Sequence, residues 1–293
     1  MAITLSKKKD AVMKNSLALA AGGMILITAL AVAAGNAAKT NRVSISYVPP
    51  TNPAHQQVYE LLKERQSLER FQEFLSPFRL QYPLHISATG CDGEADAMYS
   101  SDSIRICYEY IEDLRTYIPA ETTPAGIEPL DTVLGPFVDT VFHEFAHALF
   151  DNIGIPILGR EEDAADQVGA YIYLQLHKDE AHRLIIATVY AYMLEVEDTD
   201  PPTMEEYADE ASTPEQRAFN LSCMAYGKNP ELFEDVVTLV KMPQERLDIC
   251  EEEYELFSLA FDKLIRPHID PDLAQKVNER RWLPEATSPI LNK

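Results

Sequence analysis

Residues 143–147 read His-Glu-Phe-Ala-His, and they lie within the apolar stretch TVLGPFVDTVFHEFAHALF at positions 132–150. Apolar residues recur along this stretch at the three- and four-residue spacing of one helix face. The pattern predicts a helix from Pro129 to Phe150 that stops near Gly154. The five-residue motif is therefore expected inside a helix rather than in a loop.

The motif has the spacing H-E-x-x-H, which is typical of a hydrolytic metal site. On a helix, His143 and His147 are about 40° apart around the axis and one turn apart along it, so both imidazoles can hold one Zn²⁺. Glu144 is expected to reach a water at the metal and to act as general base without ligating the metal. Such a pentapeptide arises by chance in roughly one chain in a hundred of this length, so a further ligand is needed.

The third ligand is expected at the start of the next predicted helix, Arg160 to Leu176, which begins with acidic residues. Glu162 is the expected ligand. Asp166 is expected one turn later, where it would accept a hydrogen bond from the second nitrogen of a ligating histidine. Glu161 and Asp163 are expected to point elsewhere by helical geometry. The alternative is a helix N-terminus whose carboxylates only favour the helix dipole.

These residues resemble the gluzincin zinc metallopeptidases, in which H-E-x-x-H is completed by a glutamate of a second helix in the pattern E-x-x-A-D. Glu162-Asp163-Ala164-Ala165-Asp166 matches that pattern. The resemblance implies one Zn²⁺ per chain, held by His143, His147 and Glu162, and hydrolysis of peptide bonds in a peptide or protein substrate.

The chain from about Cys91 to Ile265 also resembles a bacterial domain-of-unknown-function family that is described as metallopeptidases. That family has a hairpin bracketed by cysteines, the motif helix, a Leu-Gly-Arg-Glu-Glu-Asp-Ala-Ala-Asp run and an Arg-x-x-Asn-Leu-x-Cys helix. Here these features are residues 91–107, 143–147, 158–166 and 217–223. The resemblance implies a shared fold and a metal site, but it does not extend to a substrate.

The remaining pattern predicts an α+β fold that is predominantly α-helical, with a small β-hairpin or sheet before the motif helix and a helical C-terminal part. Residues 84–110, in which glycines and a Ser-Ser-Asp-Ser tetrad separate short apolar runs, are expected to form the hairpin. Helical spacing predicts further helices over residues 56–78, 182–196, 214–226, 231–240 and 243–265, and the Pro-rich tail is left unassigned.

The gluzincin resemblance also implies a place for the substrate. Gluzincins align it with the edge strand of a small sheet just before the motif helix, where an Asn-Ala pair often bonds its backbone. Asp96 and Ala97 occupy the corresponding place and are expected to contact the substrate. Asp96 departs from the pattern, because an ionised aspartate accepts hydrogen bonds but does not donate them. The alternative is an ordinary hairpin strand.

Hydrolysis by this mechanism needs a donor for the developing oxyanion besides the metal. Arg217 is the expected catalytic donor, since a cation suits an oxyanion. Tyr226 and His177 are the alternatives. Each of the three also has a purely structural explanation, as a salt-bridge former, a packed phenol or a surface imidazole. Glu144 is expected to return its proton to the leaving amine.

The four cysteines fall into two local pairs, Cys91 with Cys107 and Cys223 with Cys250. Neither pair has the close spacing of a structural zinc site, so two disulfides are expected. Four cysteines allow three pairings, and proximity alone favours the sequential one. The alternative is four reduced, buried thiols.

The N-terminal sequence predicts export. Lysines are followed by an apolar run over residues 17–34 that ends in small residues, so residues 1–37 are expected to be a cleaved signal peptide or a retained membrane anchor. Residues 38–54 are expected to be a linker and residues 55–293 the zinc metallopeptidase-like domain. The protein is therefore expected in the periplasm, free or anchored to the membrane, or outside the cell.

The charge balance restricts the partners. A formal net charge of −22 repels a polyanion, which argues against nucleic-acid binding. Two functions from different classes stay open: a zinc metallopeptidase, and a non-catalytic zinc-containing binding or assembly protein of the cell envelope. The presence of Glu144 favours the enzyme, because a structural zinc site does not require a base.

Overall fold

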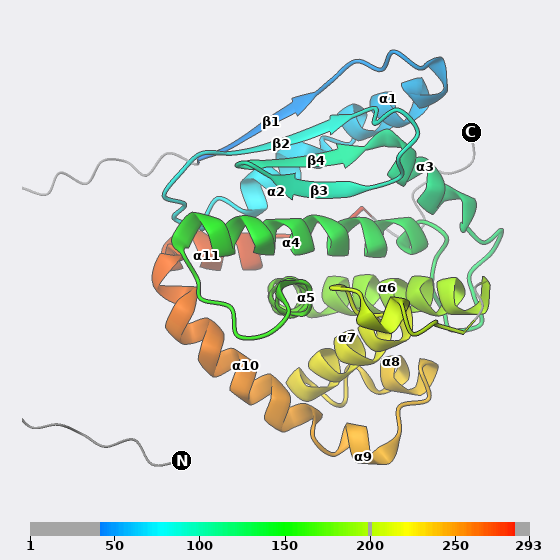
Figure 1. Ribbon diagram of the computed structural model, residues 1–293, viewed down its shortest axis with the longest axis vertical. Coiled ribbons are helices and arrows are strands. Elements are labelled where there is room, and N and C mark those ends of the chain that lie inside the picture. Colours follow the sequence, from blue (N-terminus) through cyan, green and yellow to red (C-terminus); the bar gives the residue numbers. More distant parts are fainter. Residues whose placement is uncertain (1–41, 199–200, 285–293) are drawn as a thin grey trace, which may run out of the picture. The chain divides into compact units, whose positions relative to one another are not determined.

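The computed structural model describes residues 42–198 and 201–284, and it shows an α+β fold in which helices predominate (Figure 1). This fold class is the predicted one. A small sheet lies along one side of the long helix α4 (Asp131–Ile153). On the other side of α4 lie three further helices: α5 (Glu161–Tyr173), α6 (Lys178–Asp198) and α7 (Pro214–Lys228).

The sheet has the strand order β1-β2-β4-β3. Its strands are β1 (Val43–Tyr47), β2 (Leu84–Thr89), β3 (Ala97–Ser100) and β4 (Ser103–Cys107). β1, β2 and β4 are parallel, whereas β3 is antiparallel to β4 and forms the predicted hairpin with it. In the described sheet β3 is therefore an edge strand, and it contacts α4.

Strand β1 lies inside the stretch 38–54 that is expected to be a linker. It pairs with β2 along its whole length, from Val43 opposite Leu84 to Tyr47 opposite Ala88. The apolar residues of β1 alternate with serines, so one face of the strand can meet the core. The folded body therefore begins before residue 55.

Helix α4 lies close to the predicted span 129–150 and is buried over most of its surface. Phe142, Phe145 and Leu149 pack into the core of the fold. The helix ends at Gly154, which adopts the left-handed conformation with φ of 67° and donates its backbone N–H to the Phe150 carbonyl. The chain then turns back, so that α5 packs against α4.

Residues 56–78 form two helices rather than the single helix predicted. These are α1 (Gln56–Glu64) and α2 (Ser67–Phe74). Gln66 lies between them with φ of 53°, in the left-handed region, which a right-handed helix cannot contain. A helix that was not predicted, α3 (Tyr108–Thr116), follows β4 directly.

The C-terminal part is helical, as predicted. α6 and α7 extend beyond the expected spans 182–196 and 214–226, whereas the helix expected over residues 231–240 is shorter. The expected helix over residues 243–265 is divided, and a helix also lies in the tail left unassigned. The elements are α8 (Glu234–Leu239), α9 (Gln244–Leu247), α10 (Cys250–Leu264) and α11 (Pro271–Asn278). Short 3₁₀ turns are η1 (Pro53–His55), η2 (Glu206–Ala208) and η3 (Arg266–His268).

Both expected disulfides are formed, in the sequential pairing. Cys91–Cys107 joins the loop before β3 to the end of β4, and Cys223–Cys250 joins α7 to the start of α10. Disulfides are typical of oxidising compartments. The pairing therefore agrees with an oxidising environment.

Within residues 42–198 and 201–284, no helix is long and apolar enough to cross a membrane. The expected signal peptide or anchor at residues 1–37, with its apolar run 17–34, lies outside the described residues.

Candidate metal centre

Three side chains from two helices converge where α4 and α5 meet. His143 and His147 of α4 place their Nε2 atoms 3.1 Å apart. Glu162, in the first turn of α5, places one carboxylate oxygen 3.1 Å from Nε2 of His143 and the other 3.3 Å from Nε2 of His147. The structure therefore brings together the three predicted metal ligands.

The spacing of these atoms suits a tetrahedral ion. Zinc lies about 2.0–2.1 Å from a histidine nitrogen and about 2.0–2.2 Å from a carboxylate oxygen, which puts tetrahedral ligand atoms roughly 3.3–3.5 Å apart. The separations of 3.1 to 3.3 Å between the donor atoms of His143, His147 and Glu162 are close to this value. Two imidazoles and one carboxylate fit zinc and leave a fourth position for water or substrate.

A second group of metal-type side chains does not qualify. Cys91, Cys107 and Glu109 also lie close together, but the two cysteines are joined to each other by the disulfide. A thiolate is the form of cysteine that binds metals, and these sulfurs cannot form one. Among the described residues, the histidine–glutamate group is the better metal site.

The second nitrogen of His143 has Asp166 as its partner. Nδ1 of His143 lies 2.7 Å from Oδ1 of Asp166, which is one turn beyond Glu162 on α5. A carboxylate at this position favours the tautomer that keeps Nε2 free for a metal and fixes the orientation of the ring.

The second nitrogen of His147 has a carboxylate partner as well, which corrects the expectation for Glu161. Nδ1 of His147 lies 3.0 Å from Oε1 of Glu161. Asp163, by contrast, points away from the site and pairs with Arg160 and Ser212. Glu161 and Glu162, which are adjacent in sequence, therefore approach the two different nitrogens of the His147 ring.

Arg217 does not face the open side of the site. Its Nε and Nη2 atoms donate to the two carboxylate oxygens of Asp166, at 2.9 and 2.7 Å. Asp166 and the ring of His143 therefore stand between the guanidinium and the point where the ligands converge. This position differs from the expected one, in which Arg217 bonds an oxyanion.

Behind the candidate ligands, Arg217 belongs to a partly buried polar network. Its guanidinium carbon lies 4.9 Å from the centre of the Tyr192 ring, and the Tyr192 hydroxyl donates to Asp139 at 2.7 Å. Asp139 is one turn before His143 on α4, and burial raises the pKa of its carboxyl group. The network joins α4, α5, α6 and α7 at the level of the metal ligands.

Glu144 occupies a buried position beside the edge strand. It is 8% exposed, and one of its carboxylate oxygens accepts a hydrogen bond of 2.5 Å from the backbone N–H of Tyr99 in β3. Burial raises the pKa of Glu144, against the opposing effect of His143. A raised pKa brings a carboxylate closer to the range that suits a general base.

β3 lies where the substrate strand is expected. Its outward-facing N–H groups, those of Ala97 and Tyr99, already donate to side chains of the protein. Cys107 of β4 donates its N–H to the Asp96 carbonyl, so the backbone groups of Ala97 and Tyr99 face the open edge. The N–H of Ala97 donates to the Asp96 side chain at 2.8 Å. Asp96, the residue directly before β3, thus accepts a hydrogen bond from the first residue of the strand.

The charges of the site favour a cation. Burial lowers the pKa of His143, but its hydrogen bonds to Asp166 and Glu162 outweigh burial and raise the pKa to about 9. The hydrogen bond to His143 lowers the pKa of Glu162. Burial would raise the pKa of Asp166, but Arg217 and His143 lower it. The imidazole of the metal-free site therefore carries a proton that a metal ion would displace.

The close approach of α5 to α4 depends on a glycine. A Cβ atom at Gly169 would lie 3.3 Å from the backbone nitrogen of His143, tighter than a usual contact. Gly169 is buried on the face of α5 that packs against α4. The lack of a side chain there lets Glu162 and Asp166 reach the histidines.

Some of these contacts carried no signal in the sequence. The Tyr99 contact is made by a backbone N–H, and the His147–Glu161 pair depends on how α5 is rotated on α4. The separation of Arg217 from Asp166 along the chain gives no indication of their pairing. A largely buried carboxylate such as that of Asp166 usually has a cationic partner, but the sequence does not show which arginine or lysine this is.

Two histidines one turn apart on a helix, a glutamate from the next helix and a second glutamate beside the first histidine are the residues of a metal-dependent hydrolase. A protein-family model described as “putative metallopeptidase” matches residues 47–265. The match covers most of the chain, and the chain therefore belongs to this family. No curated protein and no solved structure matches the chain.

Proposed function

We propose that this protein is a zinc-dependent metallopeptidase in which His143, His147 and Glu162 hold one Zn²⁺ and Glu144 is the general base. The observation that carries the proposal is the convergence of the three side chains: the two Nε2 atoms are 3.1 Å apart, and each lies 3.1 or 3.3 Å from one of the two Glu162 carboxylate oxygens. The family membership supports a peptidase, and the donor set supports zinc.

When bound, the ion supplies a water that is more acidic than bulk water and polarises the carbonyl group of the substrate. Glu144 takes a proton from the attacking water and passes it to the leaving amine nitrogen. Its buried carboxylate is fixed by the N–H of Tyr99, which orients it beside the two histidines. Burial also excludes bulk water from this carboxylate.

The edge strand β3 is proposed to align the substrate. The backbone groups of Ala97 and Tyr99 face the open edge, next to Glu144. Because the N–H groups of both residues already donate within the protein, an extended peptide would add to this edge by donating its own N–H groups to the carbonyls of Ala97 and Tyr99. Asp96 contributes by holding the N–H of Ala97.

Arg217 is proposed as a positioning residue instead of an oxyanion donor. Its two hydrogen bonds fix the carboxylate of Asp166, which in turn fixes the ring of His143. Loss of such outer contacts weakens metal binding roughly 10- to 100-fold in known sites.

We also propose that the protein acts outside the cytosol. The sequence of residues 1–37 has the order of a signal peptide or anchor, and the two disulfides agree with an oxidising compartment. The folded body, from β1 onward, would then be the catalytic domain in the periplasm, at the membrane surface or outside the cell.

Metal content, measured by mass spectrometry on the purified chain, tests the site first. We expect one zinc per chain, with loss of zinc in both His147→Ala and Glu162→Ala. Peptide libraries then test catalysis, with Glu144→Gln as the inactive control that retains its metal. If zinc is bound but no cleavage depends on Glu144, the non-catalytic binding protein is favoured. If no zinc is bound after loading, both the zinc metallopeptidase and the zinc-containing binding protein are excluded.

A further inference from the structure

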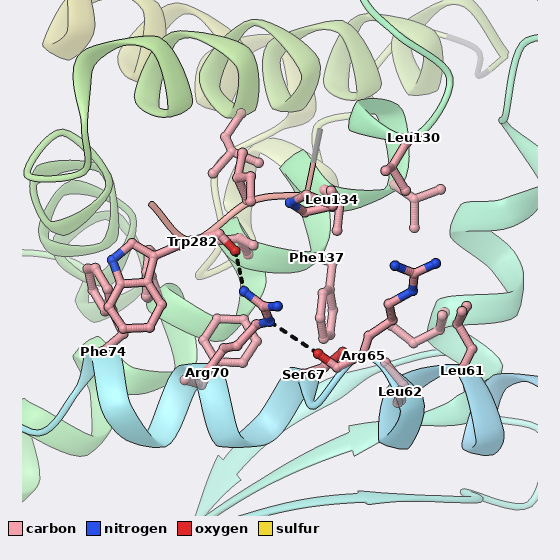
Figure 2. Close-up of a pocket in the computed structure, with 18 of the residues that line it drawn as sticks. Leu61, Leu62, Arg65, Ser67, Arg70, Phe74, Leu130, Leu134, Phe137 and Trp282 are labelled. Carbon is pink, nitrogen blue, oxygen red and sulfur yellow. Dashed lines mark hydrogen bonds between the residues drawn. The ribbon is translucent and has the colours of Figure 1, made fainter. Parts of the chain in front are cut away.

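A mostly apolar cavity of about 160 Å³ lies between the first helices of the chain and the N-terminal half of α4 (Figure 2). Leu61 and Leu62 of α1 and Phe74 of α2 line one side, and Leu134 and Phe137 of α4 line the other. None of the lining residues is a candidate metal ligand. The cavity is therefore separate from the proposed active site.

The size of the cavity suits a small apolar group. An engineered cavity of about 150 Å³ with a similar lining stays dry and binds benzene. A cavity of about 160 Å³ lined by leucines and phenylalanines can hold part of an alkyl chain in the same way. Water is a poor occupant because it would find few hydrogen-bond partners there.

The charged groups that the structure describes at this cavity all have the same sign. Among the described lining residues are Arg65, Arg70 and Arg115 but no aspartate or glutamate, although the chain has 47 acidic residues and only 25 basic ones. Among the described residues, none of the three arginines pairs with a carboxylate. Arg70 donates to the carbonyls of Arg65 and Trp282, and Arg115 donates to the amide oxygen of Gln57.

Of the three arginines, Arg65 is the one with a buried donor atom that lacks a hydrogen-bond acceptor. Its Nε atom is buried and has no hydrogen-bond partner. Arg65 directly follows α1, and Figure 2 shows its side chain pointing toward Leu130. A buried guanidinium donor beside an apolar wall is costly unless an acceptor reaches it.

We propose that this cavity binds an anionic amphiphile with a single alkyl chain, such as a medium-chain fatty acid, whose carboxylate pairs with Arg65. The alkyl chain would replace empty space between α1, α2 and α4, and the carboxylate would accept from the planar guanidinium group. Arg70 and Arg115 add positive charge at the same cavity. Charge complementarity in an otherwise acidic protein selects an anion over a neutral or cationic amphiphile.

The single tryptophan of the chain provides a direct readout, because Trp282 lines the cavity. In the full-length chain we expect 10-bromodecanoate to quench tryptophan fluorescence in a saturable way, since bromine quenches on contact. Decanoate should compete for the same site. Decyltrimethylammonium, which has the same chain and the opposite charge, should not compete.

Two matched variants test the role of the charge. Arg65→Gln should weaken binding at least tenfold, whereas Lys63→Gln, which removes a positive charge from the exposed surface of the same helix, should leave it unchanged. Leu134→Phe, which fills space and keeps every arginine, should also weaken binding. A thermal melt of each variant confirms that it is folded.

Other results would overturn the proposal. Absence of saturable quenching, equal competition by the cationic amphiphile, or equal effects of Arg65→Gln and Lys63→Gln would each exclude an anion site at Arg65. Binding to a chain that ends at Pro284 but not to the full chain would show that residues 285–293 occupy the cavity instead.

Discussion

The backbone N–H of Tyr99 donates to the carboxylate of Glu144 across 2.5 Å, and this hydrogen bond joins the edge of the sheet to the proposed general base. Glu144 comes from α4 and Tyr99 from β3, so the bond fixes the base relative to the strand that is proposed to hold the substrate. Both the proposed chemistry and the proposed alignment of the peptide would depend on how β3 packs on α4.

Replacing Glu144 with glutamine should abolish most of the activity and leave the metal in place. The amide oxygen can still accept from Tyr99, so the local structure is kept, but the side chain no longer takes a proton. Loss of a general base typically lowers the rate by about 10²–10⁴-fold. Peptide turnover and zinc content are measured on the same sample, and unchanged turnover would mean that another residue is the base.

Metal affinity should rise with pH. The pKa of His143 in the metal-free site is about 9, so below pH 9 a proton must leave the imidazole before it can bind a metal. The apparent affinity should therefore increase roughly tenfold per pH unit between pH 6 and pH 8. Competition with a chelator of known affinity measures this slope. A flat profile would show that His143 is not protonated when the metal arrives.

Replacing Arg217 with lysine should weaken metal binding roughly 10- to 100-fold, because one ammonium cannot reproduce the two parallel hydrogen bonds to Asp166. Arg246→Lys is the control, since Arg246 pairs with Glu253 far from the metal site along the chain. Zinc affinity is the readout. Equal affinities in the two variants would contradict the positioning role, and loss of turnover with unchanged affinity would return Arg217 to the role of an oxyanion donor.

Adding a methyl group at Gly169 should separate α5 from α4. The new Cβ would lie 3.3 Å from the nitrogen of His143, and overpacking of this kind typically costs about 1–3 kcal/mol of stability. We expect Gly169→Ala to lower both the melting temperature and the zinc affinity. Gln167→Ala, at an exposed position of the same helix, serves as the control and should change neither.

Because the side chain of Lys228 is largely buried, we expect the free energy of unfolding to depend on pH. Burial lowers the pKa of this last residue of α7 to about 8, whereas the unfolded chain should have a value near 10.5. Between these values the unfolded state binds more protons, so the free energy of unfolding should rise as the pH increases from 8 to 10.5. At lower pH the lysine is charged in both states and its burial cost is fully present.

The comparison of wild type with Lys228→Met isolates this contribution from other titrating groups. Relative to the variant, wild type should gain on the order of 3 kcal/mol between pH 8 and pH 10.5, as measured by urea unfolding. A difference that does not change with pH would show that the lysine remains charged in the folded protein.

The elements predicted well are those with local signals. The helix of His143 and His147 follows from a long apolar repeat, and the position of Glu162 follows from the length of the loop and the helix start. The left-handed residue Gln66 divides an expected single helix, and its sequence has no glycine or proline to mark the break. Strand β1 was missed, and so was the parallel pairing of β2, which lies in the expected hairpin segment 84–110, because parallel pairing joins distant segments and leaves no turn signal between them.

The parts of the site that were missed depend on packing between elements. Glu161 reaches His147 only because of the rotation of α5, and Arg217 reaches Asp166 only because α7 packs against α5. Asp96 was expected to bond a substrate, but its side chain accepts from the adjacent backbone N–H. Short polar side chains often bond their own backbone in this way, which the sequence alone does not reveal.

The Cys91–Cys107 bond has a consequence for when the site is completed. It closes a covalent loop around β3, the strand that holds Glu144 through Tyr99. Before its thiols are oxidised, the newly made chain holds this strand only through its noncovalent contacts. Maturation of the proposed enzyme therefore includes an oxidation step. In the compartment that forms the bond, the loop that carries Tyr99 is closed covalently, and Glu144 remains attached to it through the hydrogen bond.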